Sequence, residues 1–439
     1  MDEVKSAVKD RDSLALAALF EPLHAADIAD VIEQTDEKHR ADLLGLMKST
    51  LEGDVLSELD ESLREEVLDA LNPDQLAEAV RDLESDDVVD LLEDLDETQQ
   101  EAVLEHLEPL DRVAVEKSLA YPEESAGRLM QVEVVRAPDH WSVGETIDFL
   151  REQTDELPEQ FYHVILVDPR MKPIGNVTLG RLLGSHRDVK LTDIKEEVFQ
   201  TIPVDQDEGE VAYAFNQYHL ISAPVVDEND RLVGVITIDD AMVVLDEEHE
   251  EDILRLAGVG DGSLSDRVWD TVGRRFPWLA VNLVTAILAS LVIAQFEAVI
   301  AGFVALAVLM PIVASMGGNA GTQSLTVAVR AIATKDLTGS NVWRVIRREV
   351  MVGLVNGLIF AIVMGIVGMI WFGAPMLGVV IGVAMVVNLV IAGLAGTIIP
   401  VALEKLKIDP ALASGAFVTT VTDVVGFFAF LGLAAMVLL

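Results

Sequence analysis

Asp423 is a carboxylate inside a long apolar run, so its charge needs stabilisation by the residues or solvent around it. It lies thirteenth in the apolar run from residue 411 to 439, close to the hydroxyls of Thr419, Thr420 and Thr422. A carboxylate at the centre of a membrane helix costs about 2.5–3.5 kcal/mol on insertion scales unless it faces water or a cation. We therefore interpret Asp423 as a functional residue. A structural hydrogen bond to a neighbouring helix is the alternative.

A second polar stretch lies inside an apolar run, from Pro311 to Gln323, and reads P-I-V-A-S-M-G-G-N-A-G-T-Q. Glycines and carboxamides at membrane depth are tolerated where they pack against protein or line a wet path. Two interpretations stay open: the lining of a translocation path, and tight helix packing through Gly317 and Gly321 in a G-x-x-x-G pattern. The residues expected to line such a path are Pro311, Gly317, Gly318, Asn319, Thr419 and Thr420.

The chemical groups in these two stretches offer oxygen ligands: carboxylate, hydroxyl, amide and backbone carbonyl. Hard cations such as Mg²⁺ and Ca²⁺ prefer this set. The apolar runs contain no His and the chain has no Cys, which argues against zinc or copper. One carboxylate can hold a hydrated Mg²⁺, and two copies on a twofold axis would place two carboxylates around one path. The sequence thus predicts a divalent-cation path in a homodimer.

Five apolar runs are long enough to cross a bilayer. They cover residues 277–296, 298–328, 350–371, 376–402 and 411–439. Lys and Arg occur before the first run and in the loops after the second and fourth, whereas the loops after the first and third have none. The positive-inside rule then places the N-terminal part in the cytoplasm and the C-terminus outside the inner (plasma) membrane.

Charge is divided very unevenly along the chain. From residue 271 onward nine Lys and Arg face six Asp and Glu, a net of +3, so the first 270 residues hold 22 basic and 68 acidic residues, a net of −46. Such a field attracts cations, and it disfavours nucleic acid, which needs basic patches. Adaptation to high salt would explain a general excess of acid, but not acids gathered at particular junctions.

Periodicity divides the acidic part further. Residues 1–128 carry leucines every twelve residues from Leu59 to Leu119, each followed by a helix-capping tripeptide, which predicts an all-α superhelical N domain. Residues 129–245 alternate β-branched runs with helical pieces, and the segments 168–175 and 227–234 repeat 59 residues apart. Residues 246–275 form a connecting helix with six carboxylates at 246–252 and a glycine-rich break at 258–262. Residues 276–439 form an all-α transmembrane domain with five helices.

The repeated strand–turn–strand–Thr–helix pattern of 129–245 resembles a tandem pair of CBS modules with an α/β fold. Such pairs commonly bind adenine nucleotides, which implies ATP or another adenine nucleotide as a ligand, with Thr237 and Asp240 as the candidate contacts.

The whole chain resembles the MgtE family of magnesium channels. The order of an acidic N domain, a CBS pair, an acidic "plug" helix and five spans is that of the family. The specific motifs are P-x-x-A-S-M-G-G-N-A-G-T-Q, D-P-A-L-A-S-G at 409–415 and T-T-V-T-D-V-V-G-F-F at 419–428. The family pattern departs from this chain at Ala416, where it often has Pro, and at His219 and Val243, where some members have acids.

The resemblance implies a homodimer with a pore on its twofold axis, in which Asp423 selects hydrated Mg²⁺. It also implies that intracellular Mg²⁺ binds between the N domain, the CBS pair and the plug helix and closes the pore. The implied sensor ligands are Asp86, Asp90, Asp240, Glu248, Glu251, Asp252 and Asp409.

Two other function classes are alternatives to a Mg²⁺ channel. One is a proton- or ion-coupled secondary transporter of divalent cations such as Mg²⁺, Co²⁺ and Mn²⁺. The other is a CBS-regulated membrane enzyme, which would need a second acid, a His or a Lys in the membrane, or a phosphate-binding loop. None of these occurs within the predicted spans, so we expect no enzymatic activity.

Overall fold

The structure, a computed structural model, describes residues 2–47, 51–71, 73–95, 97–153, 157–158, 160–259 and 268–438. It divides into two compact units, Met1–Glu248 and His249–Leu439. Of the predicted connector, residues 260–267, which include part of the glycine-rich break, lie outside the described residues.

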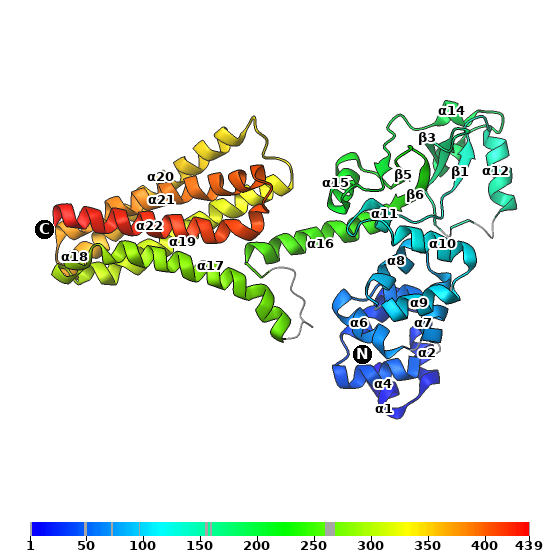
Figure 1. Ribbon diagram of the computed structural model, residues 1–439, viewed down its shortest axis with the longest axis horizontal. Helices are drawn as coiled ribbons and strands as arrows, with labels where there is room; N and C mark the ends of the chain where they lie inside the picture. Colours follow the sequence, from blue (N-terminus) through cyan, green and yellow to red (C-terminus); the bar gives the residue numbers. More distant parts are fainter. Residues whose placement is uncertain are drawn as a thin grey trace. The chain divides into compact units, whose positions relative to one another are not determined.

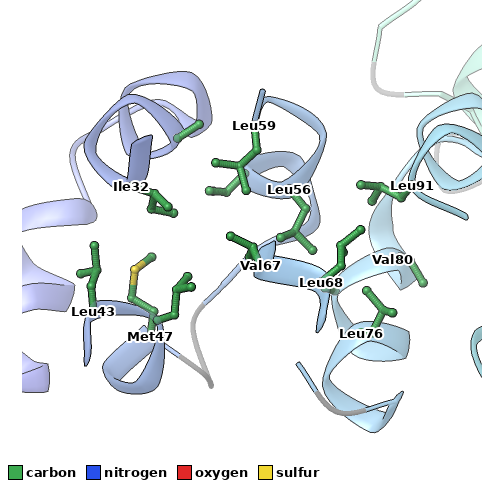
Figure 2. Packing of buried hydrophobic residues seen from close by; sticks show 14 of the residues in the cluster. Ile32, Leu43, Met47, Leu56, Leu59, Val67, Leu68, Leu76, Val80 and Leu91 are labelled. Carbon is green, nitrogen blue, oxygen red and sulfur yellow. The ribbon is translucent and has the colours of Figure 1, made fainter. Parts of the chain in front are cut away.

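The N-terminal part of the first unit is made of short helices, as the twelve-residue period predicts. They are α1 (Asp2–Asp10), α2 (Ser13–Phe20), α3 (Ala25–Glu33), α4 (Glu37–Met47), α5 (Gly53–Ser57), α6 (Glu61–Ala70), α7 (Pro73–Ala79), the 3-10 turn η1 (Val80–Asp82), α8 (Ser85–Glu93), α9 (Glu97–His106), α10 (Pro109–Ser118) and α11 (Ala126–Leu129). One continuous apolar core joins α1 to α10, as Figure 2 shows for residues from Ile32 to Leu91, whereas α11 packs in the core of the β4–β6 sheet (residues 202–237). The periodic leucines from Leu59 to Leu119 all belong to this core or pack against it.

Two small sheets follow, each with its own helices. The strands are β1 (Arg136–Pro138), β2 (His163–Val167), β3 (Pro173–Thr178), β4 (Ile202–Pro203), β5 (Ser222–Val226) and β6 (Leu232–Thr237). The helices are α12 (Val143–Glu152), α13 (Leu179–Gly184), α14 (Leu191–Ile194) and α15 (Glu208–Tyr218). In both sheets the first strand pairs parallel with the second, and the second pairs antiparallel with the third.

The 59-residue repeat is visible in detail. Asp168 and Asp227 each accept two backbone N–H groups at 2.8 Å in the turn between the antiparallel strands. Met171 and Asp230 have positive φ at the same place in their turns. His163 and Ser222, which are also equivalent, meet across the pair at 2.6 Å between Nδ1 and Oγ. The tandem α/β architecture predicted from the repeat is therefore confirmed.

A single helix, α16 (Ile238–Leu256), begins directly after β6 and contains the acidic run 246–252. Because its first turn follows Thr237, the start of α16 is fixed by the last strand of the sheet. Helix α16 ends at Leu256, two residues before the start of the predicted glycine-rich break at Gly258.

The second unit contains five long apolar helices, which run alongside one another in Figure 1, and one short helix, α18. They are α17 (Val268–Ala294), α18 (Glu297–Gly302), α19 (Ala305–Ala333), α20 (Val342–Phe372), α21 (Pro375–Lys405) and α22 (Pro410–Val437). Five of them have candidate spans: Thr271–Ala294, Ala305–Ala333, Val342–Phe372, Pro375–Lys405 and Gly415–Val437. Helix α21 lies at the centre, since α19, α20 and α22 all pack on it.

All five span limits differ by a few residues from the sequence-based ones, and the two largest differences are at the starts of the second and third spans. The second run does not form one helix from 298, because the chain breaks between α18 and α19 at Phe303 and Val304. The third span begins at Val342 rather than 350, because a charged turn with Arg344, Arg347 and Arg348 still continues the helix. Helix α22 is continuous through Ala416.

Candidate functional site

Helix α19 presents a polar stripe on its exposed side. The stripe consists of Pro311, Ser315, Asn319, Thr322 and Thr326, which recur every three or four residues and are all exposed in the single chain. The hydroxyls of Thr322 and Thr326 donate to backbone carbonyls one turn earlier, at 3.0 Å each. Among the described residues, the one hydrogen bond of the Asn319 carboxamide is that from Nδ2 to Ser315 Oγ, at 3.4 Å. A carboxamide with so few hydrogen bonds inside the chain is more stable facing water or a second chain than facing lipid, which offers no hydrogen-bond partners.

Asp423 lies on α22, partly exposed, beside a buried contact with α19. Thr422 is fully buried, and its methyl group packs on Gly321 of α19, which has no side chain to keep the helices apart. The hydroxyls of Thr419 and Thr420 donate to carbonyls of their own helix and retain lone pairs for a further donor or cation. The predicted residues Asp423, Thr419 and Thr420 are thus all partly exposed on one membrane helix.

Gly317 differs from the other residues predicted to line a path. It is buried, and a Cβ added to it would lie 2.2 Å from Nδ2 of Asn388 on α21. Gly318 has no atom within 4 Å of such a Cβ. Gly317 therefore serves helix packing, whereas Gly318, next to the polar stripe, stays open. The packing interpretation is thus confirmed for Gly317, while the lining of a translocation path stays a prediction for the exposed residues of the stretch.

Glu349 is a membrane carboxylate that the sequence-based span limits left out. It lies in the third span, near the start of α20, and is 8% exposed. Ser324 of α19 donates to its Oε2 at 2.9 Å. Its acidity alone could have drawn attention to it, but only the helix start at Val342 places it among the spans. Asp423 is therefore not the only carboxylate within a candidate span.

A first group of carboxylates gathers where α8 meets the start of α16. Asp86 is 9% exposed, and burial, followed by the charge of Asp240, raises its pKa well above the usual range. Burial and then Asp240 raise the pKa of Asp87 to about 7. Burial raises the pKa of Asp240 itself to about 6. We call Glu84, Asp86, Asp87, Glu133, Asp239 and Asp240 the α8–α16 junction.

Hydrogen bonds hold the edges of the α8–α16 junction in place. Gln131 Nε2 donates to Glu84 at 2.6 Å, and Ser85 Oγ donates to Glu133 at 2.8 Å. Even so, burial and the neighbouring Glu133 raise the pKa of Glu84 to about 7. The carboxylates at this junction therefore repel one another when they are all charged, and an added cation or proton would relieve that repulsion.

Asp90, also predicted as a sensor ligand, faces elsewhere. Arg64, 7% exposed, donates to both of its oxygens at 2.5 and 3.2 Å, and donates from Nε to Asp94 at 2.5 Å. The charge of Asp90 is thus already neutralised by Arg64. Asp90 therefore differs from Asp86 and Asp240, which face other carboxylates.

Glu248 of α16 lies at the start of α15, in a second acidic group that the sequence did not single out. A Cβ on Gly209 would lie 2.3 Å from Glu248 Oε1. Burial, followed by the charges of Glu124 and Glu247, raises the pKa of Glu208 to about 7. Only the folded chain brings Glu124 and Glu247, which are 123 residues apart in sequence, to the same place beside Glu208.

The third group lies within the second unit, at the C-terminal end of α16. Arg255 forms ion pairs with Glu251 at 2.6 Å and with Asp409 at 3.7 Å. Burial and then the charge of Asp409 raise the pKa of Asp252, while Arg255 opposes this shift. Leu256 packs against a small apolar cluster formed by Leu325, Val329, Ala411 and Val418. The end of α16 therefore contacts the ends of α19 and α22 through one cation and one leucine.

None of these groups is a finished metal site. Within the described parts of the chain, no three His, Asp or Glu side chains are arranged to hold one ion directly. The chemistry offered is that of scattered carboxylates, which suits an ion that keeps much of its water.

The hollow between the two CBS-like modules is lined by Gln131, Glu133, Tyr162, His163, Ser222 and Thr237, among others. Thr237 does not present a free hydroxyl there, since it donates to Asp239 and, at 2.7 Å, to Asp240. Asp240 in turn faces the acids of α8. The two residues predicted to contact a nucleotide are thus engaged with the α8–α16 junction.

Three family models match parts of the chain. The MgtE divalent cation transporter model matches residues 310–433, the MgtE intracellular N domain matches residues 23–124, and a CBS domain matches residues 191–247.

Similar proteins and structures point the same way. A magnesium transporter MgtE of Enterococcus faecalis is 35% identical over 322 residues, which are 73% of this chain and 71% of that protein. A magnesium transporter MgtE of Thermus thermophilus is 34% identical over 334 residues, 74% of this chain and 73% of that protein. The crystal structure of the cytosolic domain of the Mg²⁺ channel MgtE in complex with ATP superposes with a TM-score of 0.50 and 29% identity, covering 55% of this chain and 99% of that one.

Proposed function

This chain belongs to the MgtE family of divalent cation transporters, and we propose that it carries Mg²⁺ across a membrane along a path lined by α19 and α22. The observation that carries this proposal is the polar stripe of α19 together with the partly exposed Asp423 of α22, both on helices apolar enough to span a bilayer. A membrane helix keeps such groups exposed where water or a cation meets them.

The path needs a second copy to be complete. Asp423 and the stripe lie at the surface of the single chain rather than inside it, so we propose a homodimer in which two copies of α19 and α22 face each other. A hydrated Mg²⁺ would then meet two Asp423 carboxylates through its own waters. The N-terminal unit lies in the cytoplasm, because Lys and Arg gather in the loops on that side.

A test of the proposed path follows from the position of Asp423. Asp423→Asn keeps the size of the side chain but removes its charge, so Mg²⁺ uptake into liposomes should fall at least about tenfold, which corresponds to only about 1.4 kcal/mol. Glu297→Gln is the matched control, because it removes an exposed carboxylate at the start of α18 and should leave uptake unchanged. Normal uptake in Asp423→Asn would contradict the proposed path.

We also propose that cytoplasmic Mg²⁺ favours the closed state by neutralising the carboxylates beside α16. The support is electrostatic: acids on α8, α15 and α22 face acids of this one helix. Loss of Mg²⁺ would let them repel one another and weaken the contact of Leu256 with the ends of α19 and α22. Open probability measured against cytoplasmic Mg²⁺ tests this, and a flat response would contradict it.

A coupled carrier is the second candidate, since Glu349 adds a buried carboxylate to that of Asp423 within the candidate spans. Currents that reverse at the Mg²⁺ equilibrium potential, whatever the proton gradient, favour the channel.

Nucleotide binding at the CBS pair rests on the likeness to a cytosolic domain solved with ATP. Calorimetry with ATP, with and without Mg²⁺, would test it.

A further inference from the structure

Asn388 is a fully buried amide in the middle of the central helix α21. Its exposed fraction is 0%, and its Nδ2 donates to the carbonyl of Val313 on α19 at 2.8 Å. That carbonyl lies two residues after Pro311, whose missing N–H leaves a different carbonyl, that of Ala307 one turn earlier, without its helical donor. Asn388 thus adds a hydrogen bond from α21 to α19 just after Pro311.

The same amide lies between glycines of the two helices that carry the polar groups. A Cβ on Gly317 of α19 would lie 2.2 Å from Nδ2, and a Cβ on Gly426 of α22 would lie 2.8 Å from it and 3.0 Å from Oδ1. Gly426 follows Asp423 by three residues, about one helical turn. The position of the Asn388 side chain therefore sets how closely both helices approach α21 beside Asp423.

The amide is a costly choice for this position. Its Oδ1 is buried without a hydrogen-bond partner among the described residues. A buried acceptor left unpaired costs free energy, which an apolar side chain of similar shape would avoid. Leucine has the same branched outline, so packing alone does not require an amide here.

We propose that Asn388 is a positioning residue for the cation path: it ties α21 to the turn of α19 after Pro311 and, through Gly426, fixes where α22 presents Asp423. This proposal rests on the proposed function. Asn388 does not touch the ion; it acts through Asp423 and the polar stripe.

Asn388→Leu in the full-length chain separates this role from simple packing. Mg²⁺ uptake into liposomes should fall roughly tenfold, and the ratio of Mg²⁺ to Ca²⁺ uptake should decrease. The reason is that a small displacement of the Asp423 carboxylate strongly changes how it meets the ion. The thermal unfolding midpoint of the purified protein should stay unchanged or rise, since the unpaired acceptor is gone. A fall in uptake with a matching fall in midpoint would indicate a merely structural role and overturn the proposal.

A second pair of variants tests the contact with α22. Gly426→Ala should reduce uptake, because its new methyl group displaces the amide. In an Asn388→Ala background that methyl group has room, so Gly426→Ala should add no further loss. Gly432→Ala is the control on the same helix, since the nearest atom to its Cβ would be at 3.9 Å.

The outcomes distinguish this proposal from the proposed function. Normal uptake by the wild-type chain and by Asn388→Leu overturns the role of Asn388 alone, as would losses that add independently in Asn388→Ala/Gly426→Ala. A wild-type chain that carries no Mg²⁺ contradicts the proposed function and this proposal together.

Discussion

Two acidic groups beside α16 differ in what neutralises them. At the α8–α16 junction, Asp86 and Asp240 are largely buried and form no ion pair with the described residues. At the other end of the helix, Arg255 lies between Glu251 and Asp409. The first group must take its counter-charge from solution, whereas the second already has a cation in the chain.

The difference shows where an external cation has most to do. Repulsion between buried carboxylates is weakly screened by salt, so a bound ion changes the energy of the α8–α16 junction strongly. The group around Arg255 is more exposed, and a partly exposed ion pair contributes little. A sensor for Mg²⁺ should therefore depend more on Asp86 and Asp240 than on the end of α16.

The largest effect is expected from removing the buried charges. In Asp86→Asn/Asp240→Asn, the free energy of unfolding without Mg²⁺ should rise by about 2 kcal/mol, because two repelling buried carboxylates become neutral. Mg²⁺ should then add much less to the thermal midpoint of the full-length protein than it does in the wild type.

Asp90→Asn is the control, on the same helix as Asp86 but paired with Arg64. It should lower stability, because it leaves a buried guanidinium with one partner fewer. Equal shifts of the same sign in both variants would remove the distinction between the two acids.

A smaller effect is expected from pH. Glu84 and Asp87 have pKa values of about 7 and Asp240 of about 6, above the usual values of about 4 in an unfolded chain. The folded state therefore binds more protons, so stability without Mg²⁺ falls as pH rises from about 4 through 7. Saturating Mg²⁺ should flatten the curve of thermal midpoint against pH between 6 and 8. A midpoint that rises over this range without Mg²⁺ would contradict the assignment.

The smallest effect is expected at Arg255. Arg255→Gln leaves Glu251, Asp252 and Asp409 without their cation, so more Mg²⁺ should be needed to protect the chain from protease. A partly exposed pair contributes about 0.5–1 kcal/mol, which predicts a two- to fivefold rise in the protecting concentration. Arg255→Lys keeps the charge and should restore most of the protection. A shift as large as that of Asp86→Asn/Asp240→Asn would reverse the ranking of the two groups.

The sequence by itself determined features that depend on neighbouring residues. Helical period and capping gave the short helices between Leu59 and Leu119, and the 59-residue repeat gave two sheets of the same topology. Apolar length gave five spans and marked Asp423, because a carboxylate inside such a run needs an explanation wherever the helix lies.

Only the tertiary structure decided which groups meet. It placed Asp86 beside Asp240, gave Asp90 to Arg64, and brought Arg255 to Asp409. It also turned Gly317 toward Asn388 rather than toward the polar stripe. These choices depend on the path of the chain and on which helix face is buried. A local pattern shows that a side chain is charged or small, but its partner comes from a distant segment.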